Sequence, residues 1–185
     1  MSEELYRYMS FSEFVNMVQR KQLQLVSPLN WDDKYEGYVF RMMKTDEGKR
    51  EIINKTLQYL NDQNEVMDAL NQIVPKVRCK CWTENEDNVL MWNLYSYNNE
   101  AVMVSVKRES LEKIDNIDVE NLRYDIEDIS LTDEINKIIN KSGIYFFEIF
   151  KCKRKIFEYE HEVRLFSKPS TYDELMSIKD TYDKI

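Results

Sequence analysis

A chain of 185 residues is long enough to bury a hydrophobic core, and a composition of 43% hydrophobic and 32% charged residues is typical of a globular protein. The formal net charge of −8 argues against sequence-independent binding to nucleic acid, because that affinity comes mainly from basic residues along the phosphates. No apolar run approaches the roughly 20 residues of a membrane-spanning helix, and the start has no secretory pattern. We therefore expect a single cytoplasmic domain, residues 1–185, that does not engage a membrane.

The first half of the chain predicts alternating strands and helices. A short strand is expected at 5–8, and a helix cap at Ser10 opens a helix that runs to about Arg20. A second strand is expected over 23–26, before the polar, aromatic loop 30–37. Helical spacing of apolar residues then predicts a helical insertion near 47–74.

The second half continues the mixed pattern and predicts an α+β fold around a central, mainly antiparallel sheet. The helix expected at 88–95 should turn Leu90, Met91 and Leu94 inward, and Trp82, Trp92 and Tyr95 should line the core or a pocket wall. The run 144–150 fits either a strand or a helix segment. The other expected elements are strands at 77–82, 101–106 and 119–125 and a helix at 131–140.

Cysteine and histidine usage limits the chemistry. The three cysteines, Cys79, Cys81 and Cys152, have no second pair or histidine cluster that would complete a zinc site, so ordinary thiols are expected. The single histidine, His161, excludes metal centres that need two. Cys152 lies in the basic run 151–155, which is either a solvated loop or a local nucleic-acid patch.

The most informative stretch is 155–166, where acid, acid and cation recur at every second position. On a β-strand, Glu160, Glu162 and Arg164 would share one face, and His161, Val163 and Leu165 would take the other. Two carboxylates beside a guanidinium on a rigid strand can accept a proton, bind a hydroxyl or stabilise a developing cation. An exposed strand with alternating charges is the alternative interpretation.

Four segments stand out together, in this order along the chain: 5–8, 27–36, 81–83 with 90–95, and 159–165. Taken in order, they resemble the bacterial domain-of-unknown-function family numbered 2971. The chain departs from the usual family pattern at Asp32, Lys34, Ala101 and Phe157, where the family shows asparagine, proline, glycine and tryptophan. The resemblance covers most of the chain and implies a setting in bacterial defence against phage.

The layout of these segments is similar to that of ADP-ribosyltransferases, and this similarity implies that NAD is the substrate. Glu162 would then be the catalytic glutamate that stabilises an oxocarbenium-like centre, and Glu160 would position or deprotonate the acceptor. Arg164 would bind the cofactor or merely neutralise Glu162.

The same similarity assigns the cofactor-binding residues. Arg7 would reach the NAD phosphates, Thr83 would support Glu162 through its hydroxyl, and Trp31 or Tyr35 would face the nicotinamide. Each has a structural alternative: Arg7 covering the sheet, Thr83 ending a strand, and the two aromatics packing a lid.

Two other functions stay open. A non-enzymatic sensor or partner-binding module would use the loop 30–36 as its contact surface. A metal-dependent phosphodiesterase would use Glu36, Glu160 and Glu162 as magnesium ligands, although Arg164 on the same face would repel the cation. For the NAD hypothesis, the acceptor is open among nucleic acid, protein and water, and a partner protein is not excluded.

Overall fold

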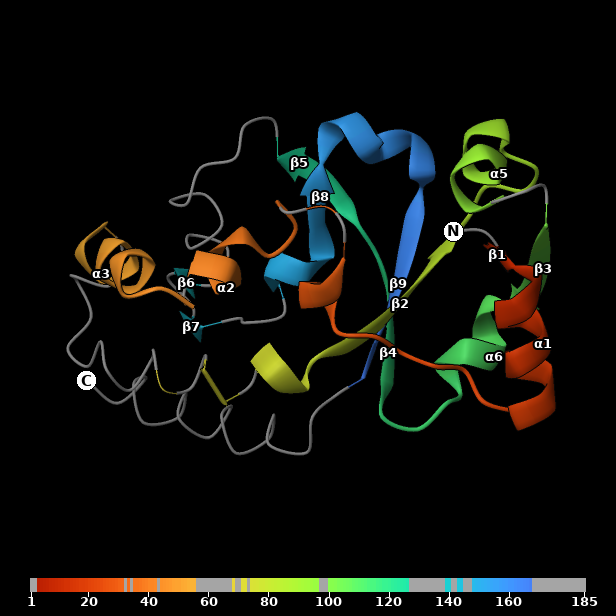
Figure 1. Cartoon of the computed structure of the whole chain (residues 1–185), viewed down its shortest axis with the longest axis horizontal. Helices are drawn as coiled ribbons and strands as arrows, with labels where there is room; N and C mark the ends of the chain where they lie inside the picture. The colour runs from red at the N-terminus through yellow and green to blue at the C-terminus, as the bar shows by residue number, and fades with distance from the viewer. Residues whose placement is uncertain are drawn as a thin grey trace. The chain divides into compact units, whose positions relative to one another are not determined.

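The structure is a computed structural model of the 185-residue chain, and it forms two compact units that are described separately (Figure 1). Unit 1 comprises Met1–Val26, Arg78–Leu122 and Ile156–Ser167, and unit 2 comprises Ser27–Val77, Arg123–Lys155 and Lys168–Ile185. No helix among the described residues is long and apolar enough to cross a membrane. The described residues are 3–31, 33, 35–42, 44–55, 68, 71–72, 74–96, 100–126, 139–140, 143–144 and 148–167.

Unit 1 is built on a five-stranded sheet of order β3-β1-β2-β9-β4, in which every pairing is antiparallel. This confirms the predicted α+β class and the mainly antiparallel sheet. Its elements are β1 (Glu4–Ser10), α1 (Phe11–Arg20), β2 (Arg78–Thr83), α5 (Val89–Tyr95), β3 (Ala101–Lys107), α6 (Arg108–Glu112), β4 (Ile117–Asn121), the 3-10 helix η6 (Lys155–Glu160) and β9 (Glu162–Ser167).

The start of the chain folds as its local signals predict. Ser10 ends β1 and caps α1, and its side chain accepts a hydrogen bond from the Glu13 backbone N–H. Lys21 ends the helix in the left-handed conformation, with φ of 51°. The strand predicted at 23–26 is wrong: this segment forms only an isolated bridge between Val26 and Cys79.

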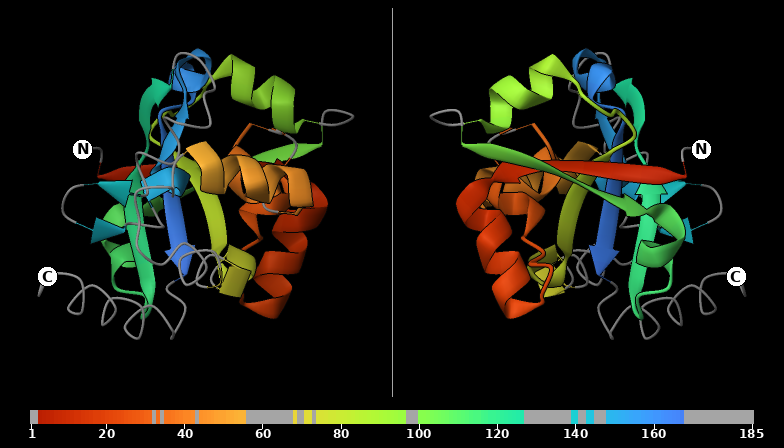
Figure 2. Two further views of the ribbon diagram at one scale, coloured as in Figure 1. Left: turned by 90° about the vertical axis from the view of Figure 1, so that its left-hand side faces the viewer. Right: turned by 90° about the vertical axis from the view of Figure 1, so that its right-hand side faces the viewer.

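The sheet of unit 1 is split between β1 and β2. β1 pairs with β3 along its whole length, from Glu4 opposite Lys107 to Ser10 opposite Ala101. The pairing of β1 with β2 is recorded only at Tyr6 opposite Thr83. In Figure 2, β1 and β3 run across the direction of β2, β9 and β4. Side chains can therefore enter between β1 and β2 where a regular ladder would close the gap.

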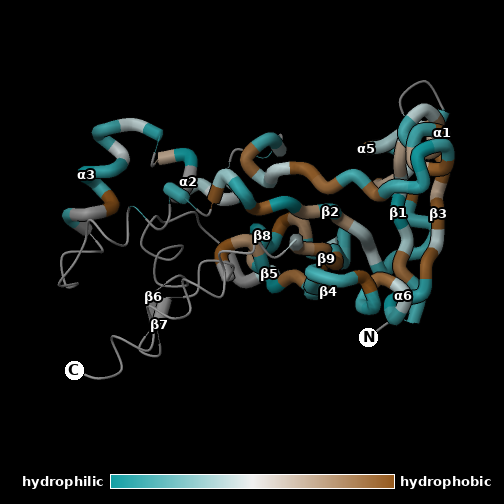
Figure 3. Tube along the Cα trace, turned by 90° about the horizontal axis from the view of Figure 1, so that it is seen from below, coloured by the Kyte–Doolittle hydropathy of each residue, from teal (hydrophilic) through white to brown (hydrophobic). Residues whose placement is uncertain are grey.

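One face of the sheet carries the hydrophobic core of unit 1. Along the strands, hydrophobic positions alternate with hydrophilic ones (Figure 3), as expected for sheet faces that differ in burial. Val163 and Leu165, both 0% exposed, lie at the centre of this core, as predicted for that face of the strand. The other buried members are Leu5, Trp82 and Leu111, and the half-buried Leu23, Leu25, Val104, Val106, Ile117 and Val119 pack against them.

The predicted continuous strand over 155–166 is wrong in its first half. Residues Lys155–Glu160 form the 3-10 helix η6, and the strand begins only at Glu162. Between them His161 takes a φ of 40°, in the left-handed region that a strand cannot continue through. Glu160 is thus not on the strand face that carries Glu162 and Arg164.

Helix α5 corrects a second prediction. Its extent and its cap are as expected, because the Asn88 side chain accepts hydrogen bonds from the backbone N–H groups of Leu90 and Met91. Only Met91 is buried, at 7% exposure, whereas Leu90 is 51% and Leu94 62% exposed. The apolar spacing found the helix but not the side that is covered.

Unit 2 contains small elements. α3 confirms the helical start of the insertion, whereas residues 56–67 lie outside the described part. The basic run is not a solvated loop, because β8 places Cys152 and Lys153 at 3% and 8% exposure. The elements are η1 (Pro28–Asn30), α2 (Tyr38–Met42), α3 (Asp46–Lys55), η3 (Val74–Lys76), β5 (Arg123–Ile126), β6 (Ile139–Asn140), β7 (Gly143–Ile144), η5 (Glu148–Lys151) and β8 (Cys152–Arg154).

Three further predictions fall on unit 2 wholly or in part. The strand expected over 119–125 is divided into β4 of unit 1 and β5, which pairs in parallel with β8. The helix expected at 131–140 falls mostly outside the described residues, and its last two residues form β6 instead, paired with β7. In 144–150, residue 144 ends β7 and 148–150 begin η5, whereas 145–147 lie outside the described residues.

Candidate functional site

A pocket opens in unit 1 where β1 and β2 diverge. Four predicted site residues, Arg7, Thr83, Glu160 and Glu162, line it together. Its volume, measured as the space open to the centre of a water-sized sphere, is about 10 Å³, room for roughly one water molecule. The empty space between the lining atoms, open solvent included, is about 280 Å³. The remaining lining residues are Tyr6, Tyr8, Cys81, Trp82, Met91 and Tyr95.

Glu162 and Arg164 form a buried ion pair on β9, as their shared strand face predicts. The Arg164 Nε donates to Glu162 Oε1 at 2.9 Å, and Nη2 lies 2.7 Å from the same oxygen. The side chains are only 4% and 1% exposed. Arg164 therefore neutralises the carboxylate, and both groups depend on each other for their burial.

Glu160 reaches the pocket from the end of η6, which the chain anchors through its backbone. The Thr83 hydroxyl donates to the Glu160 carbonyl at 2.5 Å and accepts from the Asn85 N–H at 3.0 Å. Asn85 Nδ2 donates to the Tyr159 carbonyl at 2.7 Å, and the Glu84 N–H donates to the His161 carbonyl at 3.1 Å. The predicted support of Glu162 by the Thr83 hydroxyl is therefore wrong, because its single proton is given to Glu160.

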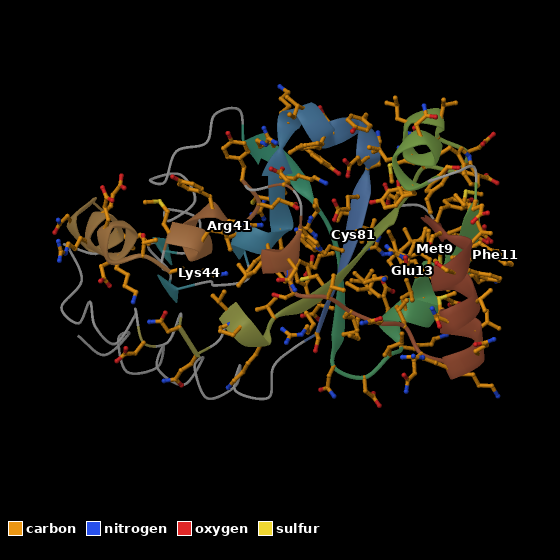
Figure 4. The ribbon with its side chains drawn as sticks, viewed as in Figure 1. Met9, Phe11, Glu13, Arg41, Lys44 and Cys81 are labelled. Carbon is orange, nitrogen blue, oxygen red and sulfur yellow. The ribbon has the colours of Figure 1, made fainter. Side chains whose placement is uncertain are left out.

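Arg7 lies between β1 and β2 and shares one carboxylate with Lys80. Arg7 Nη1 donates to the Cys81 carbonyl at 2.6 Å, and Nη2 donates to Glu13 Oε1 at 3.0 Å. Lys80 Nζ donates to the same Glu13 oxygen at 2.6 Å. Glu13 and Cys81 can be followed in Figure 4. The Arg7 Nε is buried and has no hydrogen-bond partner among the described residues.

The pKa values of this cluster follow from burial and charge. Burial acts to raise the pKa of Glu13, but the hydrogen bond from Lys80 and the charge of Arg7 act against it, and the pKa lies below its ordinary value. Burial, with the charge of Arg7, lowers the pKa of Lys80 despite its bond to Glu13. Two cations thus share one carboxylate, and Arg7 brings the excess positive charge to the pocket.

Tyr95 supplies a hydroxyl that stays protonated. Burial raises its pKa to about 12, and the charges of Cys81, Glu160 and Glu162 add to this effect, whereas Arg7 opposes it. All four are pocket residues, and Tyr95 itself lines the pocket although it is 39% exposed overall. Tyr95 can therefore donate a hydrogen bond at neutral pH.

The predicted nicotinamide-facing aromatics belong to unit 2. Tyr35 is 47% exposed, and the Arg154 guanidinium lies 4.6 Å from its ring centroid. The same guanidinium bonds Asp33 at 3.1 Å, and Arg41 donates to the Trp31 carbonyl at 3.0 Å. Arg154 and Arg41 therefore hold residues of the polar, aromatic loop 30–37 that was expected from the sequence.

The described residues limit the metal and thiol chemistry that the site can perform. There, no group of three or more His, Cys, Asp or Glu side chains is arranged to hold a metal ion. Within the same described residues, Cys79, Cys81 and Cys152 form no disulfide, and Cys81 lines the pocket.

Several contributors to this site were missed from the sequence. Tyr6, Tyr8, Cys81 and Met91 line the pocket, and Glu13 forms an ion pair with Arg7. The alternation of aromatic and basic residues over 5–8 was the available signal for Tyr6 and Tyr8. Nothing in the sequence links Glu13 with Lys80, because only the tertiary fold brings them together.

Comparison with known proteins finds no match, either to a family model, to a curated protein or to a solved structure. The pocket itself therefore carries the functional argument. It combines two carboxylates, one tied to a buried guanidinium, with a protonated phenol and the partly buried cation Arg7. Such a set can bind a hydroxyl group and stabilise positive charge that develops beside it.

Proposed function

We propose that unit 1 is an ADP-ribosyltransferase-like enzyme that cleaves NAD and transfers ADP-ribose to an acceptor. The observation that carries the proposal is the convergence of Arg7, Thr83, Glu160 and Glu162 around one pocket in a split sheet. These residues come from three separate segments, and the similarity of layout to ADP-ribosyltransferases implies a role in NAD chemistry for all four.

In this proposal, the carboxylate of Glu162 accepts a hydrogen bond from a ribose hydroxyl. As the bond between nicotinamide and ribose breaks, its negative charge stabilises the oxocarbenium-like centre. The pocket volume of about 10 Å³ suits one hydroxyl group, so in this proposal the rest of the NAD molecule lies outside it. The buried Arg164 fixes the orientation of Glu162.

Glu160 then receives the proton of the acceptor as the new bond to ribose forms, and nicotinamide leaves with the bonding electrons of the broken bond. Glu160 is suited to this step because it is half-buried and its backbone is fixed by Thr83. Arg7 supplies positive charge for the phosphates.

The test is nicotinamide release from NAD by the purified protein, measured by chromatography with and without cell extract. Glu162→Gln should lower the rate by about 10²–10³-fold, the usual effect of removing an electrostatic group from a reacting centre. Glu160→Gln should lower transfer to the acceptor more than hydrolysis. Glu109→Gln is the matched control, because Glu109 is an exposed carboxylate of the same unit with only a surface ion pair to Lys113.

Circular dichroism verifies that each variant is folded, since Glu162 is part of a buried pair. Absence of nicotinamide release under every condition, with no melting shift on addition of NAD, would reject the proposal.

One observation favours a second candidate, a partner-binding module without catalysis. The Glu162 carboxylate is already engaged by Arg164, and the enclosed pocket is small. If the Glu162–Arg164 pair has only a structural role, every Glu162 variant that folds should bind the partner as well as the wild type does. Binding without NAD turnover would therefore support the module.

A further inference from the structure

Helix α5, which contributes to the pocket, also presents apolar side chains to solvent. Val89 is 70%, Leu90 51% and Leu94 62% exposed, and these three residues are called the α5 patch below. The same helix sends Met91 and Tyr95 into the pocket lining. The patch is thus on the element that forms one wall of the proposed active site.

The exposed side of α5 is held in place by specific contacts. The Tyr8 and Trp92 rings pack edge to face with centroids 4.9 Å apart, and the Tyr8 hydroxyl accepts from the Asn88 N–H at 2.7 Å. Trp92 Nε1 also donates to Asp87 Oδ1 at 3.0 Å. These contacts fix the helix with its leucines turned outward, so solvent exposure is part of the folded arrangement.

The surroundings of the α5 patch are acidic. The segments 84–100 and 156–163 together carry seven acidic residues and no lysine or arginine. One of the seven, Glu162, is buried and paired with Arg164, so it does not add to the surface charge. The two segments meet, because Asn85 and Asn88 both donate to the Tyr159 carbonyl. Glu86, Asp87 and Glu158 are exposed there, and Glu160 lines the pocket. An apolar patch with an acidic border remains.

We infer that the α5 patch docks a protein segment that presents lysine or arginine next to apolar side chains. Apolar contact with Leu90 and Leu94 would supply affinity, and the acidic border would select cationic partners and repel phosphate backbones. Docking at α5 would hold such a segment on the helix that also contributes Met91 and Tyr95 to the pocket lining. Its role as the acceptor of ADP-ribose rests on the proposed function, whereas the docking itself does not.

The test uses fluorescently labelled probe peptides and fluorescence anisotropy, without NAD. The main probe is an amphipathic helix with leucine on one face and lysine on the other. One comparison probe replaces lysine by glutamate, another replaces leucine by serine, and a single-stranded oligonucleotide is the third. We expect the leucine–lysine peptide to bind at least about tenfold more tightly than each of the others, and more weakly as salt rises.

The variant Leu90→Ser/Leu94→Ser should weaken binding of that peptide by at least about tenfold. Val18→Ser/Ile114→Ser is the matched control, because both residues are similarly exposed apolar side chains elsewhere in unit 1. Equal binding by wild type and the α5 variant, equal loss in the control, no binding by the main probe, or preference for the glutamate peptide or the oligonucleotide would each overturn the inference. Nicotinamide release is a separate assay, so failure of the NAD chemistry is distinguished from failure of docking.

Discussion

The Glu162–Arg164 pair and the Arg7–Glu13–Lys80 cluster both lie in unit 1, but their charges are arranged differently. The pair joins one acid and one base two residues apart on β9, with side chains 4% and 1% exposed. The cluster joins side chains of β1, α1 and β2 through a single carboxylate, Glu13, whose side chain is 41% exposed.

The difference indicates which charged groups stabilise the fold and which set the electrostatic potential of the pocket. A buried neutral pair has strong mutual interactions, and removal of one partner leaves an uncompensated charge in a medium of low polarity. The cluster keeps more cation than anion, and solvent at Glu13 weakens each contact. Stability should therefore depend mainly on the pair, and the positive potential at the pocket mainly on the cluster.

Arg164→Met should have the largest effect, because it leaves the Glu162 carboxylate buried without its guanidinium. We expect a loss of about 3–5 kcal/mol in the free energy of unfolding, measured by urea denaturation. The exposed Arg20 on the same unit provides the control, and Arg20→Met should change stability by less than about 0.5 kcal/mol.

The double variant Glu162→Leu/Arg164→Met sharpens this prediction. Because both charges are removed together, it should recover part of the loss seen with Arg164→Met alone. If both variants are as stable as the wild type, the pair is not the stabilising element that its burial indicates.

The sequence predicted one of these two arrangements and not the other. Glu162 and Arg164 are two apart on a strand, so the alternation alone places them on one face. Glu13 of α1 meets Lys80 of β2 only in the tertiary fold, a contact that no local pattern encodes. The first strand and helix were also predictable, since Ser10 carries its capping signal in sequence.

Two predictions made from the sequence were wrong for similar physical reasons. The alternation over 155–166 continued through His161, but its backbone conformation ends any strand there. The spacing of Leu90, Met91 and Leu94 shows which side of α5 is apolar, but not whether another element covers that side. Local periodicity describes an element, whereas burial depends on its neighbours.

Glu13→Gln should have a moderate effect, because it leaves Arg7 and Lys80 close together without their shared anion. Since Glu13 is partly exposed, we expect a loss of only about 1 kcal/mol at neutral pH, measured by thermal or urea unfolding. The loss should shrink when salt screens the two cations. A loss as large as that of Arg164→Met would remove the distinction between the two arrangements.

The acid dependence of stability provides a third comparison. Because the folded pKa of Glu13 lies below its ordinary value of 4.5, its contribution is present above about pH 4.5 and is lost as pH falls through the folded pKa. Wild type should therefore lose its advantage over Glu13→Gln in this acid range. The control, Glu109→Gln, should run parallel to wild type, and unfolding curves at several pH values measure the difference.

Tyr95 responds to both arrangements, so its titration is the most sensitive comparison, although the effect on stability is the smallest. Burial and the pocket carboxylates raise its pKa from 10.0 to about 12, whereas Arg7 lowers it. The stabilisation linked to the protonated phenol is therefore present below pH 10 and is lost as pH rises toward 12. Ultraviolet difference titration of wild type against Tyr95→Phe isolates this group. Glu160→Gln should lower its pKa and Arg7→Met should raise it, each by less than about one unit. If both variants shift the pKa in the same direction, Arg7 does not bring net positive charge to the pocket, and the contrast between the closed pair and the open cluster fails.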